Sequence, residues 1–214
     1  PGLSPGLKFP DGFLLWGDKA GRHRVMTTHD VDFYLSARDT WFQSFQVMGA
    51  IKEGKTGHVE WPRDLFLTTE DGAPGLTIKF PESLTPEALQ DWAQNAMIAT
   101  FGMFAMAADG ALEAAYTGLG TRLDDPDGDR RNLRCIWYMI RCAFAHPSAG
   151  VPTWECRGKY QSRFTLPGSF TLDGALLHSQ PFSIGQLGGW HHVYVLLTST
   201  DNTLGVVTSP NGKQ

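Results

Sequence analysis

The chain has 214 residues, of which 42% are hydrophobic and 19% charged, and its formal net charge is −4. This is an ordinary globular composition, long enough for one large domain or a domain with an extension. The overall charge gives no preference for nucleic acid, and no run of 18 apolar residues predicts a membrane span. The three cysteines include no Cys-x-x-Cys pair, so we expect reduced thiols, a cytoplasmic location and no structural zinc site.

The first half of the chain predicts an arm, a helix and a hairpin. Residues 1–29 are rich in Gly and Pro and are expected to form an extended arm. Apolar side chains then recur at spacings of three or four, which predicts a helix over residues 30–51. Two β-like runs, residues 64–69 and 76–80, flank a turn that contains Gly and Pro, and they predict a β-hairpin inserted between helices.

Thr85-Pro86-Glu87 opens a second predicted helix, because Thr is a good N-cap and Pro suits the first helical position. The periodic pattern continues to about Tyr116, with or without a break at Asp109-Gly110. The acidic turn Asp124–Asp129 has the spacing of a calcium loop. The twelfth position counted from its first aspartate is Cys135 rather than Glu, however, so we interpret it as a solvated loop.

A third helix is predicted over residues 130–145, with Asp129 as its N-cap and Pro147 as its stop. After it the chain becomes rich in β-branched and aromatic residues, which predicts a small antiparallel sheet. The expected strands lie within residues 154–166, 170–177 and 190–197. The sequence therefore predicts an α+β fold, with a helical core in residues 1–150 and a C-terminal β extension in residues 151–214 packed on that core.

The third helix carries three arginines in a narrow arc beside its apolar face: Arg130, Arg134 and Arg141. Residues 130–163 hold seven basic residues and one acidic residue, a local charge of +6 in an acidic chain. Such a stretch suits a phosphate-bearing ligand. The candidate phosphate- or RNA-binding residues are Arg130, Arg134, Arg157 and Lys159. An equally weighted alternative is that the arginines pair with acids elsewhere, such as those of the turn at residues 124–129 or of the first helix.

The end of the third helix, Arg141-Cys142-Ala143-Phe144-Ala145-His146, resembles the Arg-x(4–6)-His signature of HEPN domains. That family is α-helical and usually dimeric, and it includes metal-independent ribonucleases of toxin–antitoxin, abortive-infection and CRISPR systems. In the family, the Arg and His of two subunits line a shared cleft. The resemblance implies that Arg141 and His146 are the catalytic pair of a HEPN-like, homodimeric endoribonuclease without a cofactor, acting in phage defence or with a protein antitoxin.

The chemistry explains why these residue types are needed. RNA can be cut by its own 2′-OH, and a histidine with a near-neutral pKa can move the proton while an arginine holds the phosphate. Active family members commonly carry a polar residue where this chain has Cys142, which favours a non-catalytic module that binds RNA, a nucleotide or a protein. A structural or assembly protein is a third alternative. His191-His192 would face opposite sides of a strand and could not chelate one metal ion.

Overall fold

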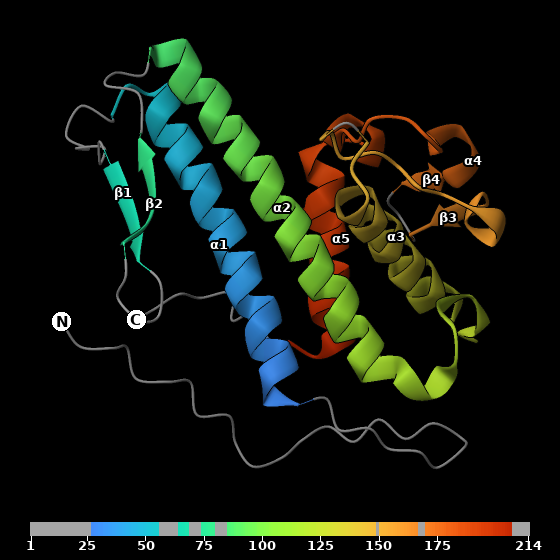
Figure 1. Cartoon of the computed structure of the whole chain (residues 1–214). Coiled ribbons are helices and arrows are strands. Elements are labelled where there is room, and N and C mark those ends of the chain that lie inside the picture. The colour runs from blue at the N-terminus through green and yellow to red at the C-terminus, as the bar shows by residue number, and fades with distance from the viewer. Residues whose placement is uncertain are drawn as a thin grey trace. The chain divides into compact units, whose positions relative to one another are not determined.

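The computed structural model describes residues 27–55, 64–68, 74–79, 85–148, 150–166 and 170–206, with the backbone alone for residues 64–68 and 74–79. Most of these residues are helical (Figure 1). The helices are α1 (Thr28–Lys52), α2 (Pro86–Tyr116), α3 (Gly128–Ala145), α4 (Gly174–Leu177) and α5 (Trp190–Leu204). The strands are β1 (Asp64–Thr68), β2 (Pro74–Lys79), β3 (Arg163–Thr165) and β4 (Thr171–Asp173). Most of the arm predicted over residues 1–29 lies outside the described residues.

The strands form two separate two-stranded antiparallel sheets, β1–β2 and β3–β4. The predicted hairpin is therefore confirmed, and the mostly helical chain with small antiparallel sheets confirms the α+β class. In the second sheet Phe164 pairs with Leu172, and both side chains are buried. The prediction of a strand over residues 190–197 is wrong, because this stretch belongs to α5.

Contacts within the chain define two compact units, and both of their boundaries fall inside the long helices α1 and α2. One unit consists of Leu35–Phe104. The other contains the described residues 27–34 and 105–206. Neither boundary lies near residue 150, where the sequence placed the start of a β extension.

In the unit Leu35–Phe104, the helices α1 and α2 pack against each other through aromatic rings. Trp41 stacks on Phe104 with ring centroids 5.3 Å apart and also contacts Phe101. Near this cluster the Thr100 hydroxyl donates a hydrogen bond of 3.1 Å to the Ser44 hydroxyl. The periodic apolar face that predicted α1 therefore packs against the corresponding face of α2.

In the other unit, α3 and α5 contact the C-terminal part of α2, since Arg141 of α3 binds Asp109 and the Tyr116 hydroxyl donates a hydrogen bond of 2.8 Å to the Thr203 carbonyl of α5. The apolar side chains of α3 are buried on one side, as its helical periodicity predicts. The Trp137 indole of α3 donates a hydrogen bond of 2.7 Å to the Thr200 hydroxyl of α5. Tyr34, in the first turns of α1, donates to the Asp201 carboxylate at 2.7 Å. These buried polar contacts join helices that are far apart in the sequence.

The N-terminus of α3 is capped two residues earlier than the sequence predicts. The Asp127 carboxylate accepts hydrogen bonds from the backbone N–H groups of Asp129 and Arg130, at 3.0 and 3.1 Å. Asp129 therefore lies in the first turn of the helix, where its negative charge also suits the helix dipole. The C-terminal end at Ala145 agrees with the prediction, and His146 is the C-cap residue.

The second long helix is continuous through Asp109-Gly110, so no break divides it. By length and composition alone, the helical span Glu87–Leu119 is apolar enough to cross a membrane, and 56% of its apolar window is buried inside the molecule. The core helix of a soluble protein has the same properties. The buried share is consistent with such a core helix.

Candidate functional site

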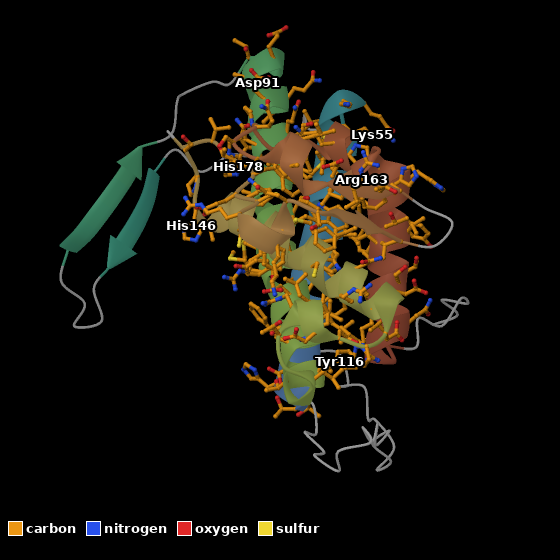
Figure 2. The ribbon with its side chains drawn as sticks, turned by 90° about the vertical axis from the view of Figure 1, so that its right-hand side faces the viewer. Lys55, Asp91, Tyr116, His146, Arg163 and His178 are labelled. Atoms are coloured by element: carbon orange, nitrogen blue, oxygen red, sulfur yellow. The ribbon has the colours of Figure 1, made fainter. Side chains whose placement is uncertain are left out.

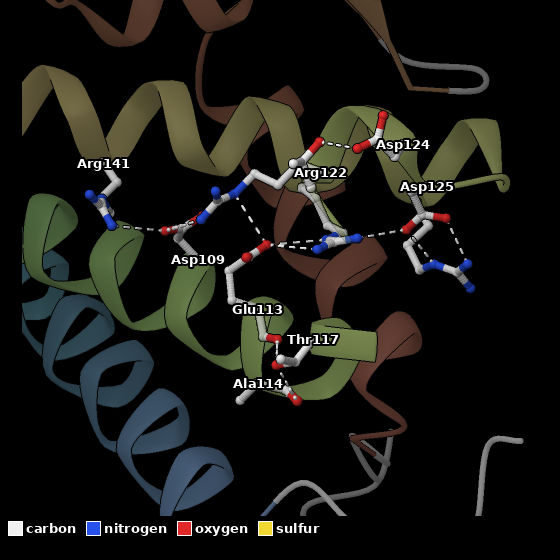
Figure 3. Close-up of polar contacts among 11 residues, drawn as sticks. Asp109, Glu113, Ala114, Thr117, Arg122, Asp124, Asp125 and Arg141 are labelled. Carbon is white, nitrogen blue, oxygen red and sulfur yellow. Dashed lines mark hydrogen bonds and ion pairs between the residues drawn. The ribbon is translucent and has the colours of Figure 1, made fainter. Parts of the chain in front are cut away.

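A chain of ion pairs links α2, the loop after it and α3, and we call it the arginine–carboxylate network (Figure 3). Its members are Asp109, Glu113, Arg122, Asp125, Arg130, Arg134 and Arg141. It contains four arginines and three carboxylates, which leaves a formal charge of +1. All of it lies within one compact unit.

At one end of the network, Asp125 binds two arginines. Arg130 donates two hydrogen bonds to its carboxylate, at 2.8 and 2.7 Å, and Arg134 donates one at 3.0 Å. Burial alone would raise the pKa of Asp125, but the hydrogen bonds from these two guanidinium groups outweigh it and lower the pKa. Asp125 is therefore a fully paired, ionised carboxylate inside the protein.

Glu113 bridges the two ends. Its Oε1 atom accepts a hydrogen bond of 2.9 Å from Arg134 and lies 3.2 Å from Nε of Arg122. Aromatic faces complete the surroundings of these cations, since Arg130 lies 4.6 Å above the Tyr116 ring and Arg122 lies 4.3 Å above the Tyr138 ring. The guanidinium groups are therefore held by both charge and aromatic contacts.

At the other end, Asp109 is shared by two arginines. Arg122 binds its carboxylate through two hydrogen bonds of 3.1 Å, whereas Arg141 makes a single contact of 3.3 Å from Nη1. Burial raises the pKa of Asp109 even though both arginines oppose the shift. Burial of Arg122 would lower the pKa of its guanidinium, but the carboxylates of Asp109 and Glu113 outweigh this effect and raise it.

The network bears on the two roles that the sequence allowed for Arg130 and Arg134. Arg134 has no exposed surface and both of its partners are carboxylates, so it cannot reach a phosphate in solution. Arg130 is 17% exposed and is held bidentately by Asp125. This arrangement corresponds to the alternative of pairing with acids, and it does not support a phosphate-binding role for Arg130 and Arg134.

The other two residues predicted to bind phosphate or RNA lie on the surface. Arg157 and Lys159 are exposed, and Arg157 pairs with Glu155. The other oxygen of this carboxylate lies 4.0 Å from Nε2 of His146. The chain after α3 folds back to bring these groups together, because the Thr153 N–H donates a hydrogen bond of 2.9 Å to the Ala143 carbonyl.

The two residues of the predicted catalytic pair have different surroundings. Arg141 is 38% exposed and contacts Asp109, whereas His146 is 63% exposed and lies beside Glu155. Among the described residues, no hydrogen bond or ion pair joins Arg141 to His146. Figure 2 shows His146 well away from Tyr116, which lies at the Asp125 end of the network. The structure thus leaves both side chains accessible without bringing them together in one chain.

Three members of the network were not predicted from the sequence: Asp109, Glu113 and Arg122. A signal for the first two was present, because they are spaced by one helical turn in a helix that is otherwise strongly apolar between residues 92 and 116. Acids on such a helix need partners when they are buried. Arg122 opens a three-residue 3₁₀ helix (Arg122–Asp124) in the connection between α2 and α3, which is too short for periodicity to indicate which way a side chain points.

Two possible metal sites were set aside from the sequence, the acidic turn Asp124–Asp129 and the pair His191-His192, and the structure adds no support for either. Asp125 and Asp127 bind arginines and backbone N–H groups rather than forming an open loop of ligands. No cluster of three or more His, Cys, Asp or Glu side chains suited to a metal ion occurs in the part of the chain that the structure describes. His191 and His192 lie in the first turn of α5 rather than on a strand, and Nδ1 of His192 lies 2.8 Å from the Gly188 carbonyl.

Comparison of the chain with protein-family models, with curated protein sequences and with solved structures gave no match.

Proposed function

We propose that the protein is a HEPN-like, metal-independent endoribonuclease in which Arg141 and His146 form the site. One observation supports this proposal above the others. Arg130 and Arg134 are committed to buried or half-buried carboxylates, whereas Arg141 and His146, the two residues of the motif, both reach solvent near the end of α3. A phosphodiester of RNA can approach these two side chains.

In this proposal the roles follow from the chemistry of the two groups. The Arg141 guanidinium holds the scissile phosphate and stabilises the charge that develops on it as the 2′-OH attacks. The His146 imidazole carries the proton that leaves the 2′-OH or enters the departing 5′-oxygen, a contribution of about 10²- to 10⁴-fold. Glu155 lies beside the imidazole, with a carboxylate oxygen 4.0 Å from Nε2.

The proposed site requires two copies of the chain. Residues five apart on a helix point about 140° away from each other, and the structure shows no contact between Arg141 and His146 within one chain. In the proposed homodimer, Arg141 of one protomer faces His146 of the partner subunit across a shared cleft. A role in phage defence or beside a protein antitoxin is part of the same proposal.

The direct test is cleavage of a mixed-sequence RNA in the presence of EDTA. Arg141→Ala and His146→Ala should each lower the rate about 100-fold or more, because each removes a group needed in the transition state. Arg131→Ala and His191→Ala are matched controls that remove the same residue types elsewhere and should keep the wild-type rate. Equal rates in all five proteins would exclude the proposal.

A mixing experiment tests the shared cleft. Arg141→Ala and His146→Ala proteins are each inactive alone, but a mixed dimer contains one site with both groups intact. Unfolding and refolding the two variants together should therefore restore part of the activity. If the mixture stays inactive while gel filtration and labelled protomers show that mixed dimers form, the two residues do not act across subunits.

A second function is favoured by a specific observation. Asp109 already neutralises part of the Arg141 charge, and Cys142, at a position where active family members commonly carry a polar residue, is buried. These features suit a non-catalytic module that binds RNA, a nucleotide or an acidic partner. Binding that weakens steeply with salt and yields no cleavage product would support this function over the nuclease.

A further inference from the structure

The two arginines that share Asp109 hold it unequally. Arg122 is 16% exposed and binds the carboxylate through two hydrogen bonds of 3.1 Å. Arg141 is 38% exposed and reaches the same carboxylate with one contact of 3.3 Å from Nη1. Asp109 itself is nearly inaccessible, with 3% of its side chain exposed. The Arg141–Asp109 pair, which faces solvent, is thus weaker than the Arg122–Asp109 pair.

This asymmetry makes Arg141 replaceable as a partner. A buried carboxylate that loses its only cation becomes an uncompensated charge, which is very costly. Asp109 would instead keep the bidentate fork of Arg122 if Arg141 moved away. The contact that is lost lies at a half-exposed guanidinium, where water screens the attraction. Exchange of Arg141 from Asp109 to an external anion therefore has a low cost.

The orientation of the guanidinium decides which of its edges an anion can use. The Nε atom of Arg141 is buried and has no hydrogen-bond partner among the described residues, so the edge formed by Nε and Nη2 is closed to a ligand from solvent. A phosphate bound bidentately must then use the edge formed by Nη1 and Nη2. Nη1 is the atom that Asp109 occupies.

We infer that Asp109 is a built-in counter-anion which competes with the RNA phosphate for Nη1 of Arg141 and thereby sets the affinity of the site. Asp109 is a positioning residue, since it acts through Arg141 and touches no substrate. The inference rests on the proposed role of Arg141 in binding phosphate. The anion that displaces Asp109 is a phosphodiester group, and the cation that retains Asp109 during the exchange is Arg122.

The test measures the affinity of the protein for a short 2′-O-methyl oligouridylate. This RNA analogue cannot be cleaved, and its base does not titrate in acid. Binding is measured by fluorescence anisotropy at fixed salt for the wild type, Asp109→Asn and Asp124→Asn. Both variants raise the net charge by one, but Asp124 is exposed and its carboxylate accepts a hydrogen bond from Thr121 rather than from Arg141. We expect Asp109→Asn to bind about fivefold more tightly, a gain that Asp124→Asn does not reproduce.

A double variant assigns the gain to one guanidinium. In Asp109→Asn combined with Arg141→Ala the gain should vanish, and the affinity should match that of Arg141→Ala alone. The inference is overturned if folded Asp109→Asn binds no more tightly than the wild type, or if the gain survives without Arg141. Failure of the proposed function is a different result, in which Arg141→Ala binds RNA as well as the wild type does.

Arg122→Lys gives an independent test that leaves the net charge unchanged, and it serves if Asp109→Asn does not fold. An ammonium group holds a carboxylate less firmly than the guanidinium fork, so Asp109 should bind Arg141 more strongly and the RNA affinity should fall. An unchanged or higher affinity in folded Arg122→Lys overturns the inference.

Discussion

Arg134 and Asp125 form an ion pair that is sealed from solvent. Nη1 of the arginine lies 3.0 Å from Oδ2 of the aspartate, and neither side chain has exposed surface. Each partner is also held from a second side, Asp125 by Arg130 and Arg134 by Glu113. The pair fastens the start of α3 to the loop before it and, through Glu113, to α2.

Removal of the Asp125 charge should be strongly destabilising, because the buried Arg134 guanidinium is then balanced by the half-exposed Glu113 carboxylate alone and Arg130 loses its bidentate partner. For Asp125→Asn we expect the free energy of unfolding to fall by about 3–5 kcal/mol. Urea titration followed by tryptophan fluorescence measures this change. Asp124→Asn, on the exposed neighbouring residue, is the control and should change stability by less than about 0.5 kcal/mol. Equal effects of the two variants would contradict a structural role for the Asp125 pair.

The Asp125 pair should also shape the dependence of stability on pH. The arginine hydrogen bonds lower its pKa below the ordinary value of 3.8, so its contribution is fully present above pH 3.8. That contribution is lost as the pH falls through the lowered pKa of the folded state. The stability difference between the wild type and Asp125→Asn should therefore shrink below pH 3.8.

Asp109 should affect the pH dependence of stability in the opposite direction. Its pKa is raised by burial, so the folded state takes up a proton before the unfolded chain does. As the pH falls from the raised pKa toward 3.8, protonation of this group alone should stabilise the fold. Unfolding is measured at a series of pH values for the wild type and Asp109→Asn. As the pH falls over this range, the free energy of unfolding of the wild type should rise relative to that of the variant. A constant difference would contradict the raised pKa.

The structure explains which parts of the sequence analysis succeeded. The helices α1, α2 and α3 were predictable because each buries one face, and burial on one face forces a periodic apolar pattern. The ion pairs of α3 were less accessible to sequence reasoning. The helical wheel places Arg134 beside the core, but only the packed structure shows that Glu113 and Asp125 bury it completely.

The error at α5 has a physical cause. Its sequence contains Val193, Tyr194, Val195 and several threonines, which favour strands intrinsically. Burial nevertheless follows a helical period, because Val193, Leu196, Leu197, Thr200 and Leu204 all face the interior. Tertiary packing thus overrides local propensity in this segment, and the exposed Tyr194 lies outside the core face.

The contact between α3 and α5 offers a test of that packing. Thr200 is fully buried, and its hydroxyl accepts the hydrogen bond of the Trp137 indole. Thr200→Val preserves the shape but removes the acceptor, so we expect a loss of about 1–3 kcal/mol in the free energy of unfolding. Thr198→Val is the control on the same helix, since the Thr198 hydroxyl donates to the Tyr194 and Val195 carbonyls of its own helix and its loss should matter little. A strand at this position would predict no such difference.

The structure and the sequence prediction differ on which residue is the N-cap of α3, and this difference can be tested directly. Both Asp127 and Asp129 are acidic residues near the helix start, but only the Asp127 carboxylate accepts hydrogen bonds from the exposed N–H groups of the first turn. Asp127→Ala should therefore lower the free energy of unfolding by about 1 kcal/mol, the usual effect of losing an N-cap. Asp129→Ala removes only an interaction with the helix dipole, and its effect should be about 0.3–1 kcal/mol and should decline as salt is added. Chemical denaturation at low and high salt distinguishes the two, because a hydrogen-bonded cap is screened less than a charge in solvent. A larger effect from Asp129→Ala would place the helix start where the sequence alone put it.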